Sequence, residues 1–137
     1  MEGGNKNKGY NPYIKSLIDH YVTTMGIDVS KIYILGASMG SMGTWHMIKN
    51  YPKFFTAAFC ASGGANECNQ ANLLHTPVYS TIGTAEGDKK MKSFRETVES
   101  INKNGGEAKL DVLEGLNHSQ ACEKAFTAER LEWVFSH

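Results

Sequence analysis

The stretch KIYILGASMG, residues 31–40, decides the fold class of this sequence. Its first half, Lys31 to Leu35, is rich in β-branched and aromatic side chains, which is typical of a short strand buried in a parallel sheet. Its second half, Gly36 to Gly40, has the composition of a sharp turn. A helix is expected after the turn and should end near Asn50, because Pro52 prevents its continuation. The stretch therefore predicts a strand, a tight turn and a helix in succession.

The same alternation extends on both sides of this stretch. Apolar residues at helical spacing predict an earlier helix over residues 12–25, which Gly26 ends. The elements expected downstream are a strand at 55–61, a strand at 77–82, a helix at 91–102, a strand at 109–113 and a last helix at 120–135. Strands that alternate with helices indicate a parallel sheet between two layers of helices. We therefore predict one three-layer α/β domain over residues 1–137, with residues 1–9 as a flexible lead-in.

The composition limits the classes of molecule that this protein is expected to bind. The 14 basic and 14 acidic side chains balance, which argues against nucleic acid or an anionic membrane as a partner. No stretch reaches the roughly 18 apolar residues that span a bilayer. The first residues also lack the apolar core of a signal peptide. The sequence thus predicts a cytoplasmic protein with no membrane or nucleic-acid partner, and secretion is the alternative if an N-terminal segment is missing.

Three cysteines, Cys60, Cys68 and Cys122, lack the spacing of a zinc or redox site. Cys68 and Cys122 both fall in loops expected at the same end of the sheet, so a disulfide between them stays open. The odd number of cysteines and the missing secretion signal favour free thiols.

Ser38 stands at the centre of a Gly-x-Ser-x-Gly pattern. A nucleophile on a tight strand-to-helix turn needs small neighbours, because the strand and the helix must approach each other closely, and Gly36 and Gly40 meet this need. The Met39 N–H, at the start of the helix, would then point toward a developing oxyanion. The competing interpretation is a glycine-rich turn in a non-catalytic α/β protein.

A serine nucleophile needs a base, and the base needs a carboxylate that orients it. His118 is the best-placed of the histidines, because it follows the fourth predicted strand in a loop at the carboxyl end of the sheet. The loop after the third strand holds two carboxylates, Glu86 and Asp88. Either of them could reach His118, so the residues alone leave the acid open.

Several runs in the sequence are similar to those of a known family. They are DVSKIYI (28–34), GASMG (36–40), MGTW (42–45), YPKFFTAA (51–58), SGG (62–64) and Pro77-Val78. The chain resembles the C-terminal half of esterase-type α/β-hydrolases, in the group of polyhydroxybutyrate depolymerases, feruloyl and acetylxylan esterases and predicted peptidases. The resemblance implies that the sheet corresponds to the fifth to eighth strands of that fold, with the N-terminal strands lacking.

The resemblance also implies functional roles. Ser38 would be the nucleophile and His118 the base, and the position of the family's aspartate falls on Glu86, with Asp88 as the alternative acid. The expected reaction is hydrolysis of small carboxylic esters through an acyl-enzyme on Ser38, without metal or organic cofactor. The alternatives are a serine peptidase and a non-catalytic fragment or subunit.

The substrate pocket is expected to involve Met42, Ser62 and Gly63, which lie near the predicted nucleophile. Without the N-terminal strands, the strand at 31–35 would be an uncovered edge, which invites association. We therefore predict a homo-oligomer that covers this edge, in a chain that is either a partial gene product or completed by another chain.

Overall fold

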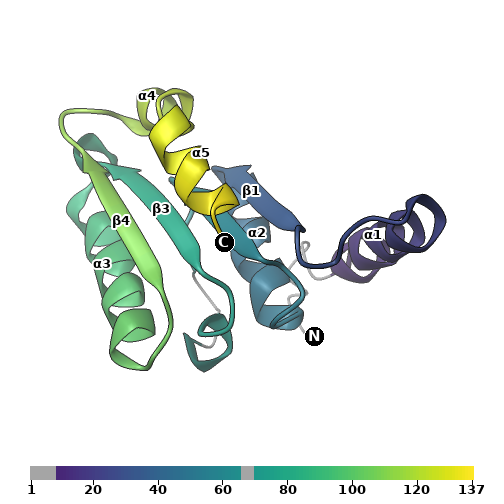
Figure 1. Cartoon of the computed structure of the whole chain (residues 1–137). Coiled ribbons are helices and arrows are strands. Elements are labelled where there is room, and N and C mark those ends of the chain that lie inside the picture. The colour runs from purple at the N-terminus through teal and green to yellow at the C-terminus, as the bar shows by residue number, and fades with distance from the viewer. Residues whose placement is uncertain (1–8, 66–69) are drawn as a thin grey trace.

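The computed structural model describes residues 9–65 and 70–137 of the chain (Figure 1). In this part of the chain one sheet of four parallel strands runs in the order β1-β2-β3-β4, so each strand pairs with the next one in sequence. The strands are β1 (Tyr33–Ala37), β2 (Ala57–Ala61), β3 (Val78–Gly83) and β4 (Ala108–Leu113). The predicted mainly parallel sheet is confirmed.

Helices cover both faces of the sheet and complete the three layers. Figure 1 shows α2 and α3 on one face and α4 and α5 on the other. The helices are α1 (Asn11–Met25), α2 (Met39–Asn50), α3 (Asp88–Lys103), α4 (His118–Glu123) and α5 (Ala128–Phe135), with 3₁₀ turns η1 (Gln70–Leu73) and η2 (Thr84–Glu86). Neighbouring parallel strands need such helical crossovers, because the chain must return to the other end of the sheet before the next strand begins.

The middle strand β2 shows why the sheet has two cores. All five of its residues are buried, and successive side chains point to opposite faces. Ala58 and Cys60 pack into the larger apolar cluster, which includes Trp45 of α2, whereas Phe59 packs with Val134 of α5 on the other face. A strand buried on both faces needs apolar residues at every position, which is why the run predicted at 55–61 is continuous.

The bounds of several elements differ from those predicted. The strand expected at 31–35 lies two residues later, at 33–37, the strand expected at 55–61 begins at Ala57, and the helix expected at 91–102 already begins at Asp88. The expected lead-in lies largely outside the described residues, because the structure describes the chain from residue 9. The possible disulfide lies outside them too, because Cys68 does.

The single helix predicted over 120–135 is wrong, because the structure has two helices, α4 and α5, in its place. Thr127 caps the start of α5 by accepting a hydrogen bond from the Arg130 N–H. The Arg130 side chain donates to the carbonyls of Lys124 and Ala125 at the end of α4 and to Asp111 on β4. These bonds stabilise the break, which apolar spacing alone does not reveal.

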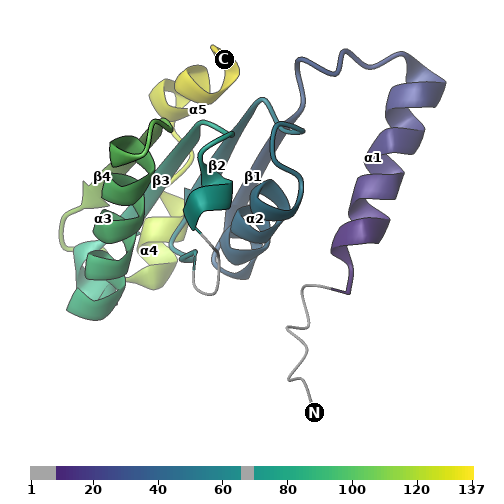
Figure 2. The ribbon, with the colours of Figure 1, turned by 90° about the horizontal axis from the view of Figure 1, so that it is seen from below.

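Helix α1 stands beyond β1, at the edge of the sheet (Figure 2). Ile18 and Val22 on one side of α1 pack against the larger apolar cluster. Tyr13, Leu17 and Tyr21 are 74%, 55% and 46% exposed. No helix in the described ranges is long and apolar enough to cross a membrane.

Candidate active site

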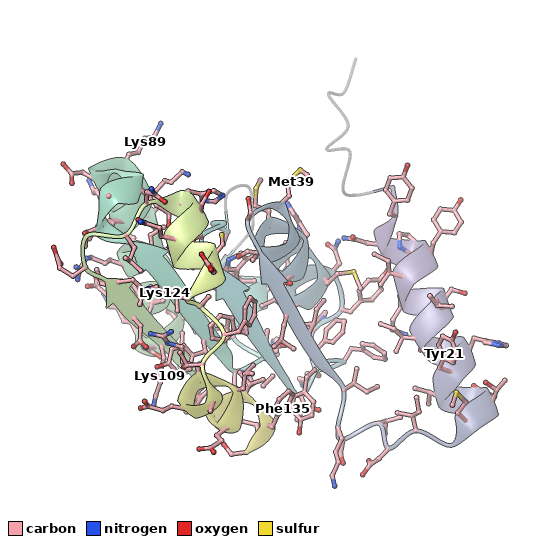
Figure 3. The ribbon with its side chains drawn as sticks, turned by 90° about the horizontal axis from the view of Figure 1, so that it is seen from above. Tyr21, Met39, Lys89, Lys109, Lys124 and Phe135 are labelled. Atoms are coloured by element: carbon pink, nitrogen blue, oxygen red, sulfur yellow. The ribbon has the colours of Figure 1, made fainter. Side chains whose placement is uncertain are left out.

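Four side chains meet at one end of the sheet because each follows the carboxyl end of a different strand. They are Ser38 after β1, Ser62 after β2, Glu86 after β3 and His118 after β4. Parallel strands place their carboxyl ends at the same edge, where α/β proteins bind ligands. In Figure 3 the labelled Met39 and Lys89 mark this end of the sheet, and Lys109 and Phe135 mark the opposite end.

The turn that holds Ser38 is tight and depends on two glycines. Ser38 has a φ of 56°, a left-handed conformation that is rare for residues other than glycine. A Cβ atom added to Gly36 would meet the carbonyl group of Gly40, and one added to Gly63 would meet the carbonyl oxygen of Ser38. Met39 is the first residue of α2, so its N–H has no acceptor within the helix.

The turn after β2 is bonded to α2. The Gly63 carbonyl accepts one hydrogen bond from the Trp45 indole N–H, at 3.0 Å, and another from the Ser41 hydroxyl. Ser41 and Trp45 are buried. The small residue after the nucleophile turn and the tryptophan of the MGTW run thus both hold the neighbouring loop in place.

Two further loops are bonded to each other and bring Glu86 beside His118. The Ala85 N–H donates to the Leu116 carbonyl at 3.1 Å, and the Gly115 N–H donates to the Thr84 hydroxyl at 2.8 Å. His118 lies at the first position of α4, one residue beyond the loop in which it was expected. Its backbone position is therefore set by the helix as well as by the loop.

Ser38, His118 and Glu86 form one hydrogen-bonded chain. The Ser38 Oγ lies 2.8 Å from the His118 Nε2, and the His118 Nδ1 lies 2.6 Å from the Glu86 Oε1. The carboxylate is acceptor-only when ionised, so Nδ1 carries the proton and Nε2 is free to accept from the serine hydroxyl. Asp88, the other candidate acid, is exposed at the start of α3. Of the two acids left open by the sequence, Glu86 is the one that contacts His118.

The Glu86 side chain is fully buried and makes four polar contacts. Its Oε2 accepts from the Gly83 N–H at 2.9 Å and from the Ser62 hydroxyl at 2.7 Å, and the Lys90 Nζ lies 3.9 Å from Oε1. Burial raises the pKa of Glu86, but the hydrogen bonds from Gly83, His118 and Ser62 outweigh it. The pKa of Glu86 is therefore lowered, and the carboxylate stays charged near neutral pH.

A cavity of about 490 Å³ opens in front of Ser38 and His118. This volume suits a small organic ligand. The residues predicted for the pocket, Met42, Ser62 and Gly63, all line it, together with Met39, Gly64, Lys89, Lys90, Ser93 and Phe94. Phe94 and Ser93 of α3 were not predicted, because nothing in the sequence shows that the first turns of α3 face this end of the sheet.

The chain is similar in sequence to known esterases. It is 34% identical over 86 residues to acetylxylan esterase A of Aspergillus awamori, covering 63% of this chain and 26% of that protein. It is 30% identical over 82 residues to poly(3-hydroxyalkanoate) depolymerase C of Paucimonas lemoignei, covering 50% of this chain and 20% of that protein. The chain thus spans between a fifth and about a quarter of the length of these relatives. No family model matches it.

The fold is that of solved esterase structures. A thermostable esterase superposes on 90% of this chain with a TM-score of 0.79 and 24% sequence identity, and the match covers 35% of that esterase. The predicted resemblance to esterase-type α/β-hydrolases is confirmed by these sequence and structural similarities.

Proposed function

We propose that this chain carries the reacting residues of a serine esterase that hydrolyses small carboxylic esters. The observation that carries the proposal is the hydrogen-bonded chain from Ser38 through His118 to Glu86, at 2.8 Å and 2.6 Å. This order of nucleophile, base and orienting carboxylate is the constellation that activates a serine hydroxyl. The cavity in front of Ser38 would hold the substrate.

In the first half-reaction, the Ser38 Oγ attacks the acyl carbon while His118 Nε2 takes its proton. The carbonyl oxygen becomes an oxyanion, for which the Met39 N–H at the start of α2 would be a donor. His118 then gives the proton to the alcohol oxygen as the ester C–O bond breaks, which leaves the acyl group on Ser38.

In the second half-reaction, water replaces the alcohol and the same proton transfers release the acid. Glu86 stays ionised throughout, because its lowered pKa keeps it charged. It fixes the proton of His118 on Nδ1 and stabilises the imidazolium that forms in each transition state. His118 thus carries the proton in both the formation and the hydrolysis of the acyl-enzyme.

The test is hydrolysis of p-nitrophenyl butyrate together with labelling by a fluorophosphonate probe. We expect the purified chain to do both, and Ser38→Ala to do neither, since the probe reacts with an activated serine. Ser80→Ala is the matched control, because Ser80 is a buried serine of β3 whose hydroxyl donates to the Lys109 carbonyl, away from the site.

Hydrolysis or labelling that survives in Ser38→Ala would overturn the proposed nucleophile. A folded wild-type chain that neither turns over the ester nor takes the label would favour the non-catalytic alternative instead.

A further inference from the structure

Ser62 has a backbone conformation that is unusual for a serine. It follows β2 with a φ of 56°, in the left-handed region where glycine is the usual residue. It is only 3% exposed, and its N–H donates to the Thr81 carbonyl at 2.9 Å. A glycine would adopt this backbone without strain, whereas serine keeps a side chain here at the cost of that strain.

The Ser62 hydroxyl is directed at the acid of the site. It donates to the Glu86 Oε2 at 2.7 Å, and the Gly83 N–H donates to the same oxygen at 2.9 Å. The second oxygen, Oε1, lies 2.6 Å from the His118 Nδ1, and the Lys90 ammonium group lies 3.9 Å from it. A carboxylate held by two donors on one oxygen cannot rotate away from the histidine on the other without breaking both bonds.

We propose that Ser62 is a positioning residue, which holds the Glu86 carboxylate so that Oε1 faces the His118 Nδ1. This inference rests on the proposed esterase function. It adds a second role to the one predicted for Ser62 in the substrate pocket: the hydroxyl donates its hydrogen to Glu86 and still has lone pairs that can accept.

The same bond sets the charge on Glu86 in a predictable direction. A donor to the carboxylate favours its ionised form, so loss of the Ser62 hydroxyl raises the pKa of Glu86. This moves the acid limb of the pH profile of kcat/KM, which requires ionised Glu86, to higher pH.

The experiment compares Ser62→Ala and Ser62→Gly with the wild-type chain. Both variants lose the hydroxyl, and the glycine variant also relieves the left-handed backbone. We expect kcat for p-nitrophenyl butyrate to fall about tenfold to a hundredfold in both, as expected for a hydrogen bond to a charged group, with KM little changed. The acid limb should move to higher pH, and a titration of the Glu86 carboxyl group followed by NMR should shift the same way.

Ser80→Ala controls for loss of a buried serine hydroxyl, and we expect it to keep the wild-type kcat and pH profile. An unchanged Glu86 titration in both Ser62 variants overturns the proposal, as does recovery of full kcat in Ser62→Gly. The NMR titration needs no turnover. If the wild-type chain hydrolyses no ester, the proposed function fails, while the titration still decides the role of Ser62.

Discussion

Glu86 supplies the buried carboxylate on which the site depends. Both of its oxygens are used, Oε2 by Gly83 and Ser62 and Oε1 by His118. A charge that is fully removed from solvent is stable only when such partners compensate for its lost hydration. Replacing it by a neutral group therefore affects both the reaction and the fold.

We predict that Glu86→Gln lowers kcat on the order of 10⁴-fold, because a neutral amide cannot stabilise the His118 imidazolium. Steady-state hydrolysis of p-nitrophenyl butyrate measures the effect. Asp88→Asn is the matched control, since Asp88 lies two residues further on and is exposed, and it should retain near-wild-type kcat. Equal losses in the two variants would contradict the assignment of the acid.

The pH dependence of stability follows from the same carboxylate. The pKa of Glu86 in the folded chain lies below its ordinary value of 4.5, so the unfolded chain binds its proton more readily. The contribution of Glu86 to stability is present above that value and is lost as the pH falls through the folded pKa. We expect the difference in unfolding free energy between wild type and Glu86→Gln, from urea titrations, to be constant well above pH 4.5 and to shrink as the pH falls below it. A difference that stays constant below pH 4.5 as well would refute the prediction.

Among the elements, the β1–α2 connection places the most severe demand on the sequence. The chain leaves β1 at Ala37 and begins α2 at Met39, with only Ser38 between them. The backbone at Gly36 therefore lies against the backbone at Gly40, which leaves no space for a Cβ atom. The two glycines of the pattern have different roles, because a Cβ atom on Gly40 would meet nothing within 4 Å.

Two alanine substitutions distinguish the steric requirement at Gly36 from the general effect of replacing a glycine by alanine. Gly36→Ala forces backbone atoms apart, and we expect it to lower the unfolding free energy by about 1–3 kcal/mol and to reduce fluorophosphonate labelling. Gly43→Ala lies within α2 in open space, and we expect it to raise the unfolding free energy by about 0.5–1 kcal/mol, since alanine favours helix. Thermal and urea unfolding measure both. A Gly36→Ala variant as stable as Gly43→Ala would mean that the turn is looser than described.

At the scale of the whole molecule, apolar side chains are exposed at the β1 edge. Leu17 and Tyr21 of α1 are 55% and 46% exposed, and Leu35 of β1 is 36% exposed. In the described part of the chain β1 pairs with β2 alone, so its other side offers unpaired backbone groups. An open strand edge with apolar neighbours is a template for pairing with another strand. We propose that a second copy of the chain covers this surface.

The 137-residue chain should therefore form a dimer or larger assembly in light scattering and small-angle X-ray scattering. Leu17→Glu should shift it toward the monomer, because a charge on the exposed side of α1 is costly to bury. Lys103→Glu, an exposed change at the end of α3, controls for added negative charge. A wild-type chain that stays monomeric at high concentration would contradict the proposal.

The order of strands and helices could be predicted from the sequence, because it depends on local periods and on glycine and proline signals. Ser38 and His118 could be predicted as site residues, since each follows a predicted strand in the chain order of a known constellation. The break between α4 and α5 could not, because it depends on Arg130 reaching Asp111 on another element. Apolar residues can keep helical spacing across such a break, so their spacing predicts one helix where the structure has two.

The sequence by itself determined that this is a parallel α/β chain with a serine on a strand-to-helix turn, because those features depend on neighbouring residues. The residues alone left Glu86 and Asp88 open and the resemblance favoured Glu86, whereas the contact with His118 is seen only in the tertiary structure. Glu86 and Asp88 are two residues apart, and the bonds of Ala85 and Thr84 to the loop before α4 bring Glu86 beside His118. The role of Ser62 is of the same kind: a hydroxyl on one strand end meets a carboxylate on the next, and only the folded sheet brings the two together.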